Sequence, residues 1–295
     1  MLFRSNFGIM SIAQRGRWGH RYLEELRRAT REAGAQGAEL VVWPESMFPF
    51  LFDRELQATY PPGHPWELAP GYHGRLLIGA LSHRFGDAGV HNSAVLIRGD
   101  GTIAGIYDKT QLLVFGEYIP MADRFPGWAA RLRASLPDWP EIVPGDGPRV
   151  LADGALRVAP LICYEDILAD HVHGAARLDA NLLVSIANHA WFGDSRAAPA
   201  AAALAILRGV ETRRDLVRAT NTGVSTVSDA LGRVTRASGL HDVDPERPPP
   251  VEVIVADVAL VEVAALGPTT APWFPWACAL ALLGVAVRWR RRSVA

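Results

Sequence analysis

The sequence is poor in cysteine, with only Cys163 and Cys278 in 295 residues. A small domain held together by disulfides needs several spaced cysteines, so this composition argues against that class of protein. For each thiol two interpretations are open. A free cysteine packs as a small hydrophobic side chain, or it reacts.

The chain also has almost no net charge, because 30 Lys and Arg balance 31 Asp and Glu. The body of the chain has no basic stripe with interleaved aromatic residues, so we expect no nucleic-acid partner. The nine histidines are scattered without the spacing of metal ligands. His171 and His173 are therefore interpreted as a solvated pair. We expect no metal and no organic cofactor.

Three polar side chains follow predicted strands directly. Glu45 comes after Leu40-Val41-Val42, Lys109 after Ile106-Tyr107-Asp108, and Cys163 after an apolar run that ends at Ile162. Strand ends present side chains to a crevice more than to the core of a sheet. Taken singly, the two charges are equally explained as solvated surface groups and the thiol as a packed one, but together they predict one site.

The remaining pattern is that of a mixed α/β protein. Apolar residues at helical spacing predict a helix over 18–33, and the alanine-rich segment 197–214 predicts a second. Gly99-Asp100-Gly101 predicts a hairpin between strands 91–98 and 102–109. Further strands are expected at 76–80, 156–162, 182–187, 216–220, 224–228 and 251–255.

Several short stretches carry a resemblance to a known family. They are Trp43-Pro44-Glu45-Ser46, Tyr107-Asp108-Lys109, Phe115-Gly116-Glu117-Tyr118-Ile119-Pro120, Ile162-Cys163-Tyr164-Glu165, Ala190-Trp191-Phe192-Gly193 and Arg218-Ala219-Thr220-Asn221-Thr222-Gly223. On these residues the sequence resembles the carbon–nitrogen hydrolase (nitrilase) superfamily and, within it, the catalytic domain of the apolipoprotein N-acyltransferases. The resemblance implies a four-layer α-β-β-α sandwich over residues 1–262.

The resemblance also implies roles for individual residues. Cys163 would be the nucleophile, Glu45 the general base, and Lys109 the cation that stabilises the tetrahedral intermediate. Glu117 and Glu165 would be supporting acids beside Tyr164, although Glu165 is explained as well by a charge at a helix N-terminus. Trp191, Phe192 and Phe115 would contact substrate.

The activity implied is a two-step acyl transfer. A phospholipid would donate its acyl chain to Cys163 as a thioester, and the N-terminal amine of a diacylglyceryl-cysteine lipoprotein would accept it. Two other functions are open on the sequence: an amidase or nitrilase that acts on small amides, and a non-catalytic relative that binds lipoproteins at the membrane.

Some positions depart from the family pattern. His189 stands where an aspartate is usual, and 199–203 lacks the usual Gln-His pair, whereas Arg208 and Glu211 are retained. The start of the chain has no signal peptide. The multi-helix membrane portion that precedes this domain in relatives is absent, so the sequence indicates either a shortened start or a stand-alone paralogue.

The C-terminal part is expected to meet a membrane. Residues 263–287 carry no charge, and four arginines follow between 288 and 292. A stretch of this length spans a bilayer as a helix, and arginines favour the cytoplasmic side. Residues 263–295 are thus predicted to be a transmembrane helix with a basic tail. The catalytic domain would face the periplasm at a bacterial inner membrane. A buried C-terminal helix is the alternative.

Two apolar runs lie beside the predicted site. One covers residues 47–52 after Glu45, and the other covers 112–115 after Lys109. Apolar side chains around a polar centre would admit acyl chains, whereas the alternative places both runs in the core. Residues between Phe125 and Trp139 are similarly explained as a membrane-contacting arm or as packed side chains.

Overall fold

The computed structural model describes residues 2–5, 12–84, 86, 89–135, 142–190, 195–239, 251–262 and 273–292. Nine strands follow one another in the sheet in the order β6-β5-β4-β2-β1-β10-β9-β8-β7. They are β6 (Ile103–Asp108), β5 (His91–Ile97), β4 (Arg75–His83), β2 (Leu40–Val42), β1 (Leu2–Ser5), β10 (Leu216–Asn221), β9 (Leu182–Asn188), β8 (Leu156–Ile162) and β7 (Leu151–Asp153). Shorter strands flank this path: β3 (Phe48–Asp53), β11 (Thr226–Ser228), β12 (Val234–Ala237) and β13 (Glu252–Ile254).

The direction of the strands brings the predicted site residues to one edge. β2 is parallel to β4, β1 is parallel to β2 and β10, and β9 is parallel to β8 and β10. The predicted β5–β6 hairpin is present, and since both of its pairings are antiparallel, β6 runs in the direction of β4. The carboxyl ends of β2, β6 and β8 therefore lie at the same edge of the sheet.

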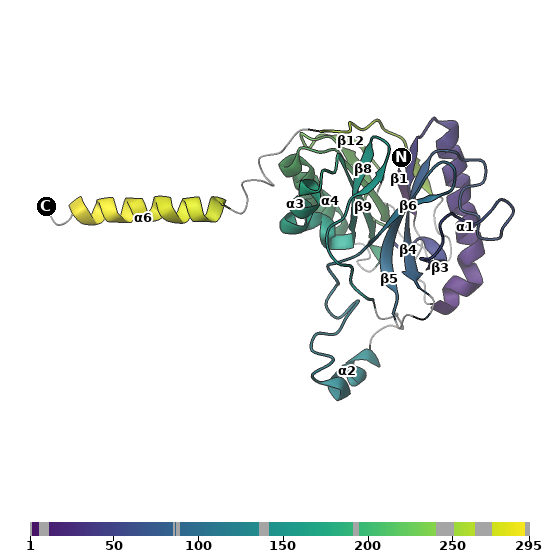
Figure 1. Ribbon diagram of the computed structural model, residues 1–295, viewed down its shortest axis with the longest axis horizontal. Helices are drawn as coiled ribbons and strands as arrows, with labels where there is room; N and C mark the ends of the chain where they lie inside the picture. Colours follow the sequence, from purple (N-terminus) through teal and green to yellow (C-terminus); the bar gives the residue numbers. More distant parts are fainter. Residues whose placement is uncertain are drawn as a thin grey trace.

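Three apolar clusters define four layers (Figure 1). Helix α1 (Ile12–Ala35) packs on one half of the sheet through residues such as Leu23 and Leu26. The central cluster joins the inner faces of the two halves, with residues of β4, β5 and β6 on one side and of β8, β9 and β10 on the other. Helices α3 (Ala169–Arg177) and α4 (Ala197–Thr212) cover the other half. This is the predicted α-β-β-α arrangement.

The apolar run after Glu45 belongs to the core. Most of residues 47–52 form β3, and Met47, Phe48 and Phe52 are buried. The rings of Phe48 and Phe52 meet edge to face, with 6.1 Å between their centroids. The run after Lys109 differs, because Leu113, Val114 and Phe115 are exposed. The core interpretation therefore holds for the first run and not for the second, and the admission of acyl chains by the second run stays a prediction.

A short helix, α2 (Pro126–Arg133), lies on a segment that protrudes from the sheet layers (Figure 1). Phe125 and Trp128 are exposed on it, whereas Ala129 is buried. Residues 136–140 of the predicted arm lie outside the described residues.

The last helix, α6 (Phe274–Arg292), extends away from the body of the molecule (Figure 1). In its described part, the side chains of Phe274, Trp276 and Leu280 are largely exposed, at 68%, 71% and 70%. Within the described ranges, no helix combines the length and the apolarity needed to cross a bilayer. Residues 263–272 of the predicted span lie outside those ranges.

Candidate active site

Glu45 is positioned by close packing of two backbones. Its segment crosses directly over Gly79 of β4, where an added Cβ would lie 2.2 Å from the Pro44 carbonyl oxygen and 2.6 Å from the Glu45 Cα. Only glycine allows this approach. The Glu45 side chain is thereby held, buried, at the end of β2 rather than in solvent.

Both carboxylate oxygens of Glu45 are engaged. The Asn92 side-chain amide donates to Oε1 over 2.7 Å, and the Asn188 backbone N–H donates to Oε2 over 2.8 Å. Lys109 Nζ lies 3.5 Å from Oε1. These contacts fix the orientation of the carboxylate and leave it available to a proton donor in the site.

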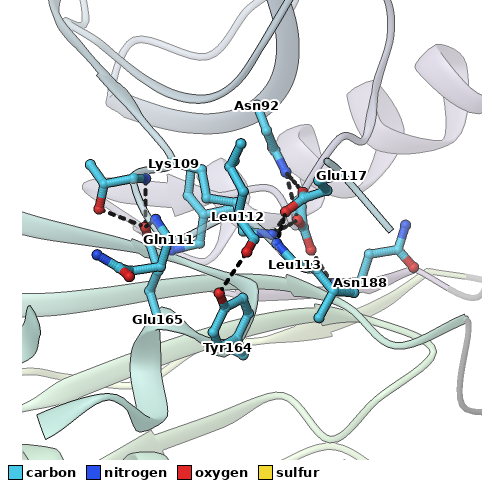
Figure 2. A network of polar contacts seen from close by, with 12 residues as sticks. Asn92, Lys109, Gln111, Leu112, Leu113, Glu117, Tyr164, Glu165 and Asn188 are labelled. Carbon is cyan, nitrogen blue, oxygen red and sulfur yellow. Dashed lines mark hydrogen bonds and ion pairs between the residues drawn. The ribbon is translucent and has the colours of Figure 1, made fainter. Parts of the chain in front are cut away.

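Lys109 is buried between two acids. Its Nζ donates to Glu117 Oε1 over 2.8 Å, in addition to the Glu45 contact. Asn92 also contacts Glu117 Oε1 at 3.4 Å (Figure 2). Lys109 is moreover the only lysine among the chain's 30 basic residues. Every other Lys or Arg position of the chain is an arginine. A compact ammonium and a planar guanidinium are not interchangeable in their hydrogen-bond geometry.

Cys163 lies at a sharp turn between β8 and a 3₁₀ helix, η1 (Cys163–Ile167). Its φ of 60° is in the left-handed region, which is unfavourable for a residue with a side chain and recurs at functional positions. Cys163 is partly exposed as a residue, although burial is the main cause of the raised pKa of its thiol. The turn presents a side chain at the edge that holds Glu45 and Lys109.

The three groups act on one another electrostatically. Burial raises the pKa of Glu45 above its ordinary value, and Lys109 opposes part of that effect. Desolvation and then the Glu45 charge raise the pKa of Cys163, against the opposing effect of Lys109. Burial alone would lower the pKa of Lys109, but Glu45, followed by other nearby acids, raises it. These shifts favour a neutral thiol at Cys163 and an ammonium at Lys109 in the resting site.

A nearby cation by itself favours the thiolate form of a cysteine. The desolvation of the sulfur outweighs the attraction of Lys109. A protonated thiol needs a base at the moment of attack, and Glu45 is the acid whose charge acts most strongly on that thiol.

Glu165 is fully buried and receives hydrogen bonds from three segments of the chain. Its oxygens accept from the backbone N–H groups of Thr110 (2.7 Å), Gln111 (3.0 Å) and Ile162 (2.8 Å). The Tyr107 hydroxyl adds a fourth donor at 2.8 Å. Glu165 thus ties the loop after Lys109 (Figure 2) to Ile162, the residue before Cys163. The contact with Ile162 is also the one expected of an acid in the first turn of a helix.

Tyr164 contacts the loop that follows Lys109. Its hydroxyl donates to the Leu112 carbonyl over 3.0 Å, and its ring lies 5.6 Å from Lys109 Nζ (Figure 2). Glu117 Oε2 accepts from the Leu113 N–H over 2.8 Å. The structure therefore brings together six predicted residues: Glu45, Lys109, Glu117, Cys163, Tyr164 and Glu165.

The three residues predicted to contact substrate are less constrained. Phe115 is 48% exposed on the loop after Lys109, with a φ of 63°. Trp191 and Phe192 lie outside the described residues. The interpretation of His171 and His173 as solvated was wrong, because both are buried; His171 contacts the Tyr107 hydroxyl and His173 contacts Glu211. Among the described residues, no cluster of potential metal ligands is present.

Two residues of the site were missed from the sequence, Asn92 and Asn188. Asn188 ends β9, directly after a predicted strand, so the strand-end rule that identified Glu45 applies to it as well. Asn92 is the second residue of β5, and since β5 is antiparallel to its neighbours, the start of β5 lies at the edge where they end. The predicted hairpin between strands 91–98 and 102–109 already implied that residue 92 lies at the edge where strand 102–109 ends.

A four-layer α/β sandwich with a buried Glu–Lys pair and a cysteine on a strained turn defines a class of protein, the nitrilase-like enzymes. The solved structures agree in fold. A mutant of the Nesterenkonia AN1 amidase from the nitrilase superfamily has a TM-score of 0.57 at 18% sequence identity, covering 82% of this chain and 86% of that one. A carbon-nitrogen hydrolase from Helicobacter pylori G27 has a TM-score of 0.57 at 16% identity, covering 81% and 85%.

Residues 19–267 match the Carbon-nitrogen hydrolase family, and the chain belongs to that family. Curated relatives include the apolipoprotein N-acyltransferase of Rhizobium meliloti, 36% identical over 70% of this chain and 39% of the relative. The apolipoprotein N-acyltransferase of Geobacter metallireducens is 31% identical over 96% of this chain and 53% of the relative. The chain spans about half the length of these relatives, or less.

Proposed function

We propose that this protein is an N-acyltransferase that moves an acyl chain from phospholipid to the N-terminal amine of a diacylglyceryl-cysteine lipoprotein, with Glu45, Lys109 and Cys163 as its catalytic residues. The observation that carries the proposal is the convergence of a buried carboxyl group, a buried ammonium and the Cys163 thiol at one sheet edge. The curated relatives with this activity support the choice of substrate.

The first half of the reaction forms a thioester. Glu45 takes the proton from the Cys163 thiol as sulfur attacks the ester carbonyl of the phospholipid. The Lys109 ammonium stabilises the oxyanion of the tetrahedral intermediate. When the C–O bond breaks, Glu45 returns the proton to the leaving oxygen, which gives a lysophospholipid and acyl-Cys163.

The second half transfers the acyl chain to nitrogen. The lipoprotein amine attacks the thioester carbonyl, and Glu45 accepts a proton from that amine. The intermediate collapses with cleavage of the C–S bond, the product is an amide, and the proton passes to the departing sulfur. Water as acceptor would give hydrolysis instead, which is the chemistry of an amidase.

The exposed apolar loop after Lys109 fits a lipid substrate better than a small amide. Leu113, Val114 and Phe115 are each more than 40% exposed, beside a polar and buried centre. Exposed apolar side chains grouped in this way mark interaction surfaces. We therefore place the acyl chain of the donor along this loop.

The direct test is the mass of the acyl-enzyme. Intact-mass spectrometry after incubation with phospholipid in mixed micelles is expected to show one acyl adduct on the wild type. The adduct is expected to be absent from Cys163→Ala and retained in Cys278→Ala, the matched control on α6. An adduct that survives in Cys163→Ala contradicts the assignment, and ammonia release from small amides without lipid would favour an amidase.

We further propose that the C-terminal segment, residues 263–295, anchors the domain to a bacterial inner membrane with the site facing the periplasm. The support is the uncharged sequence from 263 to 287, the exposed apolar side chains of α6, and the arginines that follow them. A helix with this pattern places its apolar residues in lipid and its arginines among head groups.

Binding to lipid vesicles tests the anchor. The double substitution Leu280→Asp and Leu283→Asp is expected to release the protein from vesicles in a flotation assay, since a charge in the hydrocarbon region costs about 2.5–3.5 kcal/mol. Leu207→Asp, at a leucine that is 48% exposed on α4, is the matched control and should float as the wild type does. Equal flotation of all three proteins would refute the anchor.

A further inference from the structure

A buried cluster behind the site is not used by the proposed reaction. It consists of Asp166 in η1, Arg218 in β10 and His189 after β9, none of them more than 6% exposed. Arg218 Nε donates to Asp166 Oδ2 over 2.8 Å, and Arg218 Nη2 lies 3.1 Å from His189 Nε2. An arginine that is completely buried needs its charge balanced and its donors satisfied.

The protonation of His189 follows from these contacts. A guanidinium only donates hydrogen bonds, so Nε2 of His189 must be the acceptor and the ring is neutral with its proton on Nδ1. Burial, and secondarily the Arg218 charge, lowers the pKa of His189 to about 3. Asp166 supplies the negative charge that balances Arg218, so a neutral histidine is compatible with this position.

His189 is also connected to the proposed base. Its backbone N–H donates to the Asn221 carbonyl over 2.9 Å. The preceding residue, Asn188, donates its backbone N–H to Glu45 Oε2 over 2.8 Å. That N–H belongs to the peptide between Ala187 and Asn188, and the His189 N–H belongs to the next peptide along the same ladder with β10. The placement of His189 therefore bears on the end of β9 from which Glu45 is contacted.

The other end of the cluster reaches the nucleophile. Asp166 is three residues after Cys163 within η1, and its Oδ2 also accepts from the Ser185 hydroxyl in β9 over 2.6 Å. The cluster thus runs from the helix that begins at Cys163, through β10, to the loop that contacts Glu45.

We infer that Asp166, Arg218 and His189 form a positioning unit, in which His189 holds the Asn188 N–H against Glu45 and so sets the geometry between the base and the Cys163 thiol. The inference rests on the proposed function of Glu45 and Cys163. None of the three residues touches substrate; they act through Asn188 and η1.

Gly223 shows how closely the ring is held. A Cβ added to Gly223 would lie 2.7 Å from His189 Nδ1. Gly223→Ala is therefore expected to displace the His189 ring without altering any side chain of the unit. It gives a second way to disturb His189 that does not remove the acceptor.

The test compares His189→Leu with His189→Gln in the full-length chain carrying Cys278→Ala. Leucine removes the acceptor for Arg218, whereas the Gln side-chain oxygen reaches about as far as Nε2 and restores it. The readouts are the rate of Cys163 alkylation by iodoacetamide across pH and the rate of acyl-adduct formation. We expect His189→Leu and Gly223→Ala to slow both rates by up to about 10²-fold. His189→Gln is expected to recover most of the loss.

The pH profile separates positioning from stability. The Asn188 N–H lowers the pKa of Glu45, so its loss should move the acid limb of alkylation to higher pH in His189→Leu and not in His189→Gln. Lys109, Glu117 and Cys163, the other groups that face Glu45, are unchanged in every variant.

Two results would overturn the inference. One is that all variants have the same alkylation and adduct rates and the same acid limb. The other is that His189→Leu and His189→Gln lose equal amounts of both rates, in proportion to a loss in melting temperature. If the wild type forms no acyl adduct yet the alkylation limb shifts only in His189→Leu and Gly223→Ala, the positioning unit stands and the acyl-transfer proposal fails.

Discussion

Replacing Glu45 with glutamine is expected to slow acyl-adduct formation on Cys163 by about 10²–10⁴-fold, the usual contribution of a general base. The thiol has a raised pKa, because its surroundings desolvate it and Glu45 is negative, so few molecules contain the thiolate without a base. Glutamine keeps the shape of the side chain and still accepts from the Asn188 N–H, but it does not take a proton.

The measurement is the single-turnover rate of adduct formation by rapid-quench mass spectrometry. Glu24→Gln, at a carboxylate 60% exposed on α1, is the matched control and should react as the wild type does. In the wild type, the rate should fall with decreasing pH around a midpoint above 4.5, because burial raises the pKa of Glu45 above that ordinary value. A Glu45→Gln rate within a few-fold of the wild type would remove Glu45 from the role of base.

Much of the site could be predicted from the sequence because residues that directly follow parallel strands meet at one edge of a sheet. Glu45, Lys109 and Cys163 each follow a strand, and β2, β6 and β8 run in the same direction, so their ends meet. What the sequence could not provide was the distance across the two halves of the sandwich. That distance depends on the packing of side chains such as Tyr107 and Val184 between the sheets, which periodicity does not describe.

His171 was misjudged because histidine is usually solvated. It is buried here, together with Glu165, which the resemblance did imply for the site. They share the Tyr107 hydroxyl, which lies 3.1 Å from His171 Nε2 and 2.8 Å from Glu165 Oε2. A network of this kind joins residues more than 50 positions apart, so no local pattern predicts it. His189 is similar, since only the Arg218–Asp166 pair explains why a histidine fits there.

The single lysine is a signal in the sequence that could have been given more weight. A chain that uses arginine for every other cation has a specific need for an ammonium at Lys109. The structure gives the reason, since Nζ lies between Glu45 at 3.5 Å and Glu117 at 2.8 Å in a space without solvent. Three rotatable donors on one small group suit two carboxylates that approach from different directions.

Replacing Lys109 with methionine is accordingly expected to lower the free energy of unfolding by about 3–5 kcal/mol near neutral pH, since it leaves two buried carboxylates without their counter-charge. The loss should depend on pH. Burial raises the folded-state pKa of Glu45 above its unfolded value, and removing Lys109 raises it further. A carboxylate with a raised folded pKa favours the folded state at low pH and disfavours it as pH rises through that pKa.

The difference between wild type and Lys109→Met should therefore be small at pH 5 and large at pH 8, as measured by urea unfolding. Lys109→Arg is the informative partner variant, because it restores the charge but not the shape. It should recover part of the stability, through its permanent charge, while acyl-adduct formation stays as slow as in Lys109→Met, because the planar guanidinium does not reproduce the position of Nζ. If Lys109→Arg recovered both the stability and the rate of adduct formation, the requirement for a compact ammonium would be wrong. If the loss of stability in Lys109→Met were independent of pH, the coupling between Lys109 and Glu45 would be wrong.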